Sequence, residues 1–151
     1  REIPTTKATL IRTPPQNYKP QRVTIKKPIT QAHCAIGRPA YPLNDERRLP
    51  FFMLVNLLGG PGLNSRFNMT LREKHGLVYG IDANYSPFID TGFVGIYFAT
   101  DKDNLEKANS LIMKEIQLLK DKILGKQQLH ATKEQLMGQL AMAEESNQSF
   151  M

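Results

Sequence analysis

The chain has 151 residues, of which 40% are hydrophobic and 23% charged, and its formal net charge is +6. This length and apolar content are sufficient for one domain with a hydrophobic core. No run of about 18 apolar residues occurs, which excludes a helix that spans a membrane. The charge is uneven: residues 1–50 hold ten Lys or Arg against three Asp or Glu, whereas residues 51–151 hold ten against eleven. Basic residues scattered among prolines favour a solvated segment over a nucleic-acid-binding groove.

Residues 1–21, "REIPTTKATLIRTPPQNYKPQ", are predicted to be a basic, Pro-rich linker. They contain four prolines and few consecutive apolar residues, as extended linkers do. The chain starts without Met and without the apolar core of a signal peptide, so we expect a fragment or a processed chain and assign no compartment. Residues 22–151 are expected to form part of one domain.

Two strands are predicted near the start of that domain. The first is "RVTIKKP" at 22–28, where Val23 and Ile25 alternate with other residues, and the second is "TQAHCAIGRPAY" at 30–41. The single cysteine, Cys34, excludes an intrachain disulfide and is expected to be a small buried residue of the second strand.

Two helices should come next. The first is expected over Asp45–Gly59, with an N-cap oxygen from Asn44 or Asp45 and a glycine at its end. A Gly/Pro turn leads to a shorter helix over about 65–74, whose apolar residues do not form a clean helical stripe. Gly76 is expected to adopt the left-handed conformation that lets a chain reverse after a helix.

A β-hairpin and two further helices complete the predicted elements. The strands of the hairpin, Val78–Tyr85 and Gly92–Thr100, are rich in aromatic and β-branched residues and flank a turn of Ser, Pro and Asp. The helices are expected over 101–125 and 126–146, because apolar residues recur there at spacings of three and four. Candidates for the N-cap of the first of these helices are Thr100, Asp101 and Asp103.

The predicted order, strand-strand-helix-helix-strand-strand-helix-helix, favours an α+β fold. We expect a two-layer α/β sandwich in which helices pack on one face of an antiparallel sheet. The sequence stops inside a helical pattern, at "NQSFM", so we expect a truncated domain. An unfinished sheet edge could pair with a second copy of the chain and form a homo-oligomer.

The sequence contains no recognisable catalytic centre of its own. A zinc hydrolase needs closely spaced ligands, yet His33, His75 and His130 are isolated, and no H-E-x-x-H or H-x-x-E-H motif occurs. No G-x-S-x-G elbow surrounds a serine, and the segment "LGGPGLNSR" lacks the Lys and Ser/Thr of a phosphate-binding loop. We therefore expect no metal or cofactor on this chain.

Five separated sequence elements nevertheless form a pattern, and they are Leu57–Gly60, Ser65–Arg66, Arg72–Tyr79, Asp90–Gly92 and Ala99–Asp101. In this order and spacing, over about residues 29–145, the chain resembles the pitrilysin/insulinase family of zinc peptidases (inverzincins), which includes the mitochondrial processing peptidases. Pro61 and His75 depart from residues that are usual in the family. The inverted zinc motif of the family's N-terminal half is missing, so the resemblance is to the C-terminal, zinc-free half and to its processing-peptidase-like fold.

The resemblance implies that this chain acts together with a second, zinc-bearing half. In the family, two similar halves close around an extended peptide, and the N-terminal half, on the same chain or on a partner chain, holds the zinc cofactor and a general-base glutamate. Arg72 and Tyr79 match the Arg/Tyr pair of the zinc-free half. Tyr79 would donate its O–H to the oxyanion of the tetrahedral intermediate, and Arg72 would bind a neighbouring substrate carbonyl. The chain alone is expected to be inactive.

Other interpretations of the same residues stay open. From the residues alone, Arg72 could pair with a helix neighbour and Tyr79 could fill the core. The resemblance also allows a catalytically inactive scaffold or partner subunit of the same family. The presence of both Arg72 and Tyr79 favours the peptidase half over the scaffold. The peptide specificity is not predicted by any motif in this chain.

Overall fold

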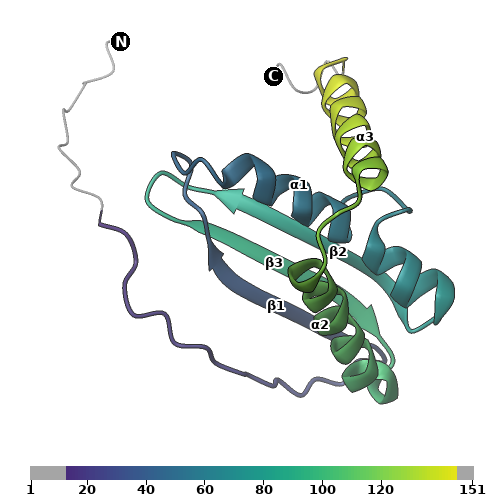
Figure 1. Cartoon of the computed structure of the whole chain (residues 1–151). Helices are drawn as coiled ribbons and strands as arrows, with labels where there is room; N and C mark the ends of the chain where they lie inside the picture. The colour runs from purple at the N-terminus through teal and green to yellow at the C-terminus, as the bar shows by residue number, and fades with distance from the viewer. Residues whose placement is uncertain (1–12, 146–151) are drawn as a thin grey trace, which may run out of the picture.

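The computed structural model describes residues 13–145 (Figure 1). Its elements, in order, are β1 (Ala32–Ala40), α1 (Arg48–Gly59), the π-helix η1 (Asn68–Lys74), β2 (Val78–Pro87), β3 (Gly92–Thr100), the 3-10 helix η2 (Lys102–Asn104), α2 (Leu105–Asp121) and α3 (Lys126–Glu145). The expected α+β architecture with an antiparallel sheet is confirmed. Within the part of the chain that the structure describes, no helix is long and apolar enough to cross a membrane.

The sheet has three antiparallel strands in the order β1-β3-β2, with the β2–β3 hairpin at its centre and one edge. The predicted strand at 22–28 is wrong, because these residues form no strand, and Val23 and Ile25 are 75% and 73% exposed. Alternation over so few residues produces a strand only where a sheet face can bury it. Figure 1 shows this segment running outside the sheet before it enters β1.

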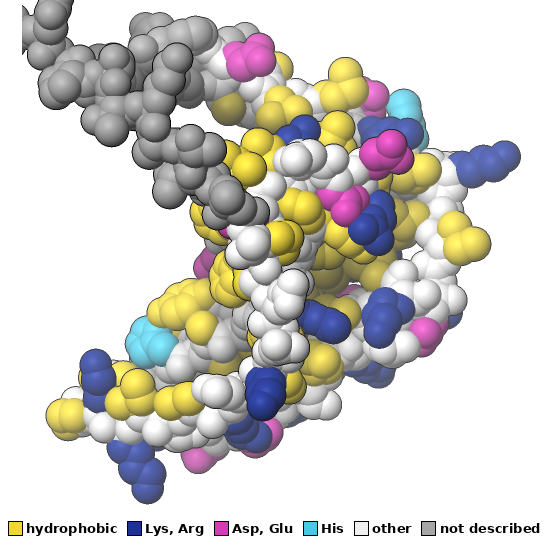
Figure 2. Space-filling view, turned by 90° about the vertical axis from the view of Figure 1, so that its left-hand side faces the viewer, with side chains coloured by type: hydrophobic (Ala, Val, Ile, Leu, Met, Phe, Trp, Pro, Cys, Tyr) yellow, Lys and Arg dark blue, Asp and Glu magenta, His cyan; other side chains and the backbone are white. Residues whose placement is uncertain are grey.

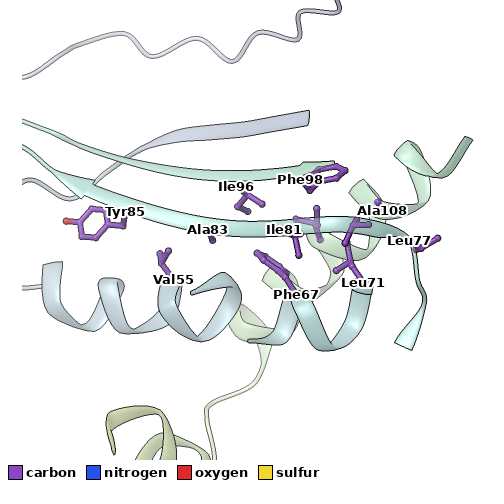
Figure 3. Close-up of a cluster of buried hydrophobic side chains, with 12 residues drawn as sticks. Val55, Phe67, Leu71, Leu77, Ile81, Ala83, Tyr85, Ile96, Phe98 and Ala108 are labelled. Carbon is purple, nitrogen blue, oxygen red and sulfur yellow. The ribbon is translucent and has the colours of Figure 1, made fainter. Parts of the chain in front are cut away.

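One face of the sheet is buried and the other is open. Ile81 and Ala83 of β2 and Ile96 and Phe98 of β3 point to the buried face, each with an exposure of 8% or less. Figure 3 shows the sheet edge-on, with α1 and η1 below it and their side chains directed up to these residues. The side chains that reach the sheet from the helices include Val55, Phe67 and Leu71. This packing is the helix layer that the sequence predicts.

Helix α1 begins at Arg48, later than the sequence indicates, and the expected N-cap is not used. The N-cap position is occupied by Arg47, and no side chain caps the helix. The carboxylate of Asp45 instead accepts hydrogen bonds from the backbone N–H of Arg47 at 2.8 Å and from its guanidinium at 2.7 and 2.9 Å. Pro50 lies in the first turn, where a missing N–H costs nothing.

Helix α1 lies against β2 along its length. Near its start, the ring of Phe51 meets that of Tyr85 edge-on at 5.0 Å between centroids. At its end, Gly59 is so close to β2 that an added Cβ would lie 2.8 Å from the Cβ of Ala83. Glycine at this position therefore allows the helix and the strand to touch.

The helix expected over 101–125 is divided into η2 and α2. The apolar stripe is as predicted, since Ala108 and Ile112 of α2 are fully buried. The expected N-cap oxygen is absent: Asp101 and Asn104 occupy the N-cap positions of η2 and α2, and neither side chain makes a capping bond. The carboxylate of Asp101 has a different partner, described below.

The Asp45–Arg47 contact predicts an acid-sensitive contribution to stability. Its hydrogen bonds to Arg47 lower the pKa of Asp45 from 3.8 to about 2. Because the folded state favours the charged carboxylate, this contribution is complete above the unfolded pKa and is lost as the pH falls through about 2. We expect Asp45→Asn to lower the melting temperature at neutral pH, and the difference from wild type to disappear between about pH 4 and pH 2.

Thermal unfolding followed by circular dichroism across this pH range measures the difference. Arg47→Gln is the control, because it removes the two guanidinium bonds and keeps the backbone bond to Asp45, so the acid-sensitive part of the stability should become smaller without disappearing. A difference between Asp45→Asn and wild type that persists unchanged at pH 2 would contradict the assignment.

Candidate functional site

The open face of the sheet is defined here by Asp82 and Asn84 of β2, Phe93 and Tyr97 of β3, and His33 of β1. Asp82 stands directly opposite Tyr97, and all five side chains are exposed. His33 and Tyr97 stack with ring centroids 6.0 Å apart, and the Tyr97 hydroxyl lies 2.6 Å from Nδ1 of the histidine. This face therefore carries polar and aromatic side chains in solvent.

Basic residues do not concentrate on the surface that Figure 2 presents, which is the left-hand side of Figure 1. Among the described side chains on this face, Lys and Arg are spread between hydrophobic groups. A nucleic-acid-binding surface would need its positive charge clustered on one face or along one helix.

The chain reverses between η1 and β2, and this reversal separates the two residues that the sequence singles out. The N–H groups of Gly76 and Leu77 donate to the carbonyls of Arg72 and Leu71 at 2.9 and 2.8 Å. Gly76 has φ +58°, as predicted, and a side chain would be strained there. Leu71 is fully buried, so η1 is anchored in the core while the next residue, Arg72, points away from it.

Arg72 lies on a π-helix, a geometry often found at functional sites. Its side chain is 46% exposed, and its Nε lies 3.9 Å from a carboxylate oxygen of Glu73, which is 55% exposed. An ion pair of this length between exposed groups is weak. The alternative in which Arg72 pairs with a helix neighbour is thus present in the structure, but only as a loose contact. Thr70 ties the same helix to α2 through a 3.0 Å hydrogen bond to Glu115.

Tyr79 lies in a β-bulge at the start of β2. Val78 is paired with Thr100 and Gly80 with Ala99, so Tyr79 is an extra residue without an opposite partner in the ladder. A bulge of this kind changes the direction of a side chain and is common beside active sites. Tyr79 is 56% exposed. The alternative in which Tyr79 fills the core is therefore wrong.

Thr100 fixes the two strand ends on which the site depends. It is fully buried, and its hydroxyl donates to the carbonyl of Leu77. This bond connects the last residue of β3 to the residue just before β2. Tyr79 follows Leu77 in the chain and Asp101 follows Thr100. The bond between Thr100 and Leu77 consequently holds these two residues near each other.

The hydroxyl of Tyr79 donates a 2.8 Å hydrogen bond to Oδ1 of Asp101. This bond, and after it the negative charge of the carboxylate, raise the pKa of the Tyr79 phenol above its ordinary value. Among the described residues, the hydrogen-bond partner of this phenol is therefore Asp101 and not Arg72. The structure exposes both predicted site residues on either side of the Gly76 reversal, and it adds a carboxylate that the sequence did not assign to the site.

The sequence gives only a faint signal for Asp101. It belongs to the family element Ala99–Asp101, but it is 22 positions from Tyr79, and its expected role is that of a helix cap. Its contact with Tyr79 depends on the hairpin register and on the bulge, neither of which is visible in the pattern of apolar residues.

The His, Cys, Asp and Glu side chains of the described residues are scattered. In the part of the chain that the structure describes, no group of three or more His, Cys, Asp or Glu side chains is placed to hold an ion. His75 is exposed on the reversal after η1, and His130 is exposed on α3.

Comparison with known proteins shows the family. A sequence model described as "Peptidase M16 inactive domain" matches residues 2–136. The chain is 31% identical over 134 residues to the Bacillus subtilis (strain 168) protein named "Uncharacterized zinc protease YmxG", with 89% of this chain and 32% of that protein covered. It is 30% identical over 131 residues to a Rickettsia felis protein named "Uncharacterized zinc protease", with 87% and 32% covered.

Solved structures share the fold. The peptidase M16 inactive domain of Pseudomonas fluorescens superposes with a TM-score of 0.69 at 23% identity, over 76% of this chain and 28% of that one. A protease from Helicobacter pylori gives a TM-score of 0.74 at 17% identity, over 83% and 30%.

The chain belongs to the M16 peptidases, the pitrilysin/insulinase family, and corresponds to their inactive domain. The resemblance expected from the five sequence elements is thus confirmed. The chain spans about a third of the length of the curated relatives that it matches.

We expect Thr100→Val to destabilise the protein by about 1–3 kcal/mol, because it leaves the buried carbonyl of Leu77 without its donor. Chemical denaturation measures the loss. The matched control is Thr132→Val, which is also buried but donates to the carbonyl of Gln128 within its own helix. That carbonyl keeps its helical N–H donor, so this change should cost less. Equal losses in the two variants would show that the Thr100 hydroxyl has no special role.

Proposed function

We propose that this chain is the C-terminal, non-zinc-binding half of a zinc metalloendopeptidase, which closes on an extended peptide and stabilises the tetrahedral intermediate. The observation that carries the proposal is the exposure of Tyr79 and Arg72 on the two sides of one chain reversal, each on irregular backbone. A phenol and a guanidinium held on such geometry suit the recognition of carbonyl oxygens. Membership of the M16 family supports the assignment.

Tyr79 is the proposed donor to the reacting oxygen. When a peptide carbonyl is attacked, negative charge develops on its oxygen, and a donor fixed in a closed, poorly hydrated cavity stabilises that charge more than water does. The phenol suits this role because it presents one O–H at the end of a rigid ring. The bulge places that ring outside the ladder, where a peptide could approach it.

Arg72 is the proposed anchor for a neighbouring carbonyl of the same peptide. A guanidinium presents several N–H donors in a fixed plane and stays charged at all working pH values. Its contact with Glu73 is long and exposed, so a substrate carbonyl could replace it at little cost. Binding on both sides of the scissile bond would hold the peptide in line.

Zinc is assigned to the other half of the protein. No three His, Cys, Asp or Glu side chains of the described residues lie together so as to hold an ion, whereas relatives are named zinc proteases. We therefore assign the attack on the peptide bond to an N-terminal half, on the same chain or on a partner chain. Residues 1–21 would be the linker that joins the N-terminal half to this domain; residues 13–21 form no helix or strand, and the rest of the linker lies outside the described residues.

A second candidate is a non-catalytic subunit of the same family. The description of the matching domain as inactive is compatible with it. In such a subunit, Tyr79 and Arg72 would have no role in turnover. Substitution of these residues would then leave peptidase activity unchanged, whereas it would lower the activity of a peptidase half.

We expect Tyr79→Phe, made in the full-length protein, to lower kcat roughly a hundredfold or more while KM changes little, because the lost hydrogen bond acts on the transition state. Peptidase assays on a quenched fluorescent peptide measure both constants. Tyr97→Phe is the control, because it removes another exposed, hydrogen-bonded hydroxyl from the same sheet. Similar losses in both variants, or a matching fall in melting temperature for Tyr79→Phe, would argue against the role.

Arg72→Ala should instead act mainly on binding, with kcat/KM lower by roughly tenfold or more. Arg72→Lys should recover only part of the loss, since an ammonium cannot reproduce the planar set of donors. Lys74→Ala removes an exposed cation from the same π-helix and serves as the control. If Lys74→Ala weakened binding as much as Arg72→Ala, the loss of positive charge alone would explain the effect, and the specific role of Arg72 would be contradicted.

A further inference from the structure

We propose that Asp101 is a positioning residue for Tyr79: it holds the phenol at the end of β3 until a peptide carbonyl oxygen replaces it as the acceptor. The inference rests on the proposed function and deepens it. It adds to the site a carboxylate whose contact with Tyr79 joins two residues that are far apart in the sequence.

The hydrogen bond itself defines what Asp101 can do. The Tyr79 hydroxyl has a single O–H and donates it to Asp101 at 2.8 Å. It can therefore serve either the carboxylate or a substrate oxygen, but not both at once. In the free protein the carboxylate fixes the ring, which is otherwise 56% exposed. An exposed side chain that is already ordered loses less conformational freedom when the bound peptide carbonyl gains negative charge and becomes its acceptor.

The direction of the Asp101 side chain is not explained by its own helix. Asp101 occupies the N-cap position of η2 with extended backbone, φ −71° and ψ 151°. An aspartate at such a position usually accepts a hydrogen bond from a backbone N–H of the first turn. Here no side-chain capping bond forms, and the N–H of Asn104 donates to the backbone carbonyl of Asp101. The carboxylate is thus directed to the phenol in place of its usual local partner.

The surrounding backbone keeps the two groups in register. Thr100, the neighbour of Asp101, is fully buried and bonded to Leu77. The bulge between Val78 and Gly80 places Tyr79 on the other side of the same strand junction. Both partners therefore extend from backbone that lies next to buried, hydrogen-bonded residues. We expect a change of the Asp101 side chain to reach Tyr79 through the single bond between them.

The test uses two variants in the full-length protein. Asp101→Ala removes the acceptor, and we expect kcat to fall by roughly tenfold or more with KM nearly unchanged, because the phenol is no longer held in place. Asp101→Asn keeps an acceptor oxygen on a side chain of the same length, so this variant should retain most of the wild-type kcat. Asp82→Ala and Asp82→Asn are the matched controls, because Asp82 is also exposed, and its carboxylate accepts from Asn84; both should keep the wild-type kcat.

A second measurement follows the phenol directly. Tyrosine labelled with ¹³C at Cζ reports the ionisation of each phenol by NMR, and Tyr79→Phe identifies the resonance of Tyr79. In wild type this phenol should titrate above its ordinary pH range, because a charged acceptor favours the protonated form. Asp101→Asn and Asp101→Ala should both move the titration to lower pH, while the Asp82 variants leave it in place. This shift reports the Tyr79–Asp101 bond in solution, and the split between kcat and KM then separates positioning of the phenol from a purely structural role.

The double variant separates failure of this inference from failure of the proposed function. If Asp101 acts through Tyr79, the double variant should have the same kcat as Tyr79→Phe alone. The inference is overturned if Asp101→Ala keeps wild-type kcat, if the Tyr79 titration does not move, or if the double variant is slower than Tyr79→Phe. If Tyr79→Phe itself has wild-type activity, the proposed function fails and this inference fails with it.

Discussion

The hydrogen bond from the Thr100 hydroxyl to the Leu77 carbonyl joins the end of β3 to the entrance of β2, and the candidate site is built around this junction. On the buried side, the same strands carry Ile81 and Phe98 into the core beneath the sheet. On the other side, the chain continues to Tyr79 and Asp101. Because a buried hydroxyl and its acceptor are costly to separate, the core fixes the backbone from which both exposed side chains extend.

Two kinds of irregular backbone meet at this junction. The π-helix η1 carries Arg72 beside the buried Leu71, and the bulge carries Tyr79 outside the ladder. In a regular helix or strand, the direction of each side chain would follow from its position in the repeat. Irregular backbone persists only where the surrounding packing holds it, and here fully buried residues such as Phe67 and Leu71 supply that packing.

The hairpin and the helix layer could be predicted because their sequence periods are strong. Gly92–Thr100 agrees with β3, and buried Ala108 and Ile112 match the expected helical stripe. The strand expected at 22–28 fails because Val23 and Ile25 have no sheet face to cover. Alternation alone cannot tell whether such a face exists.

The candidate site was only partly predictable, for a different reason. Arg72 and Tyr79 belong to one short sequence element, so the resemblance to the peptidase family could nominate both as candidates. The contact between Tyr79 and Asp101 crosses from one strand to the next and depends on a single unpaired residue. Apolar patterning reports which side of a strand is buried, but it does not report a bulge, and the expected role of Asp101 as a cap followed from local sequence alone.

The bulge also constrains the number of residues at the start of β2. Deletion of Tyr79, the one residue between Val78 and Gly80, would restore continuous pairing with β3. The sheet could then form without loss of its core. The phenol would then be missing from the junction, or another side chain would take its place there. The turn between β2 and β3 can accept changes in length, because it lies at the far end of both strands. We therefore expect insertions and deletions among relatives to fall in that turn and to be absent from the bulge.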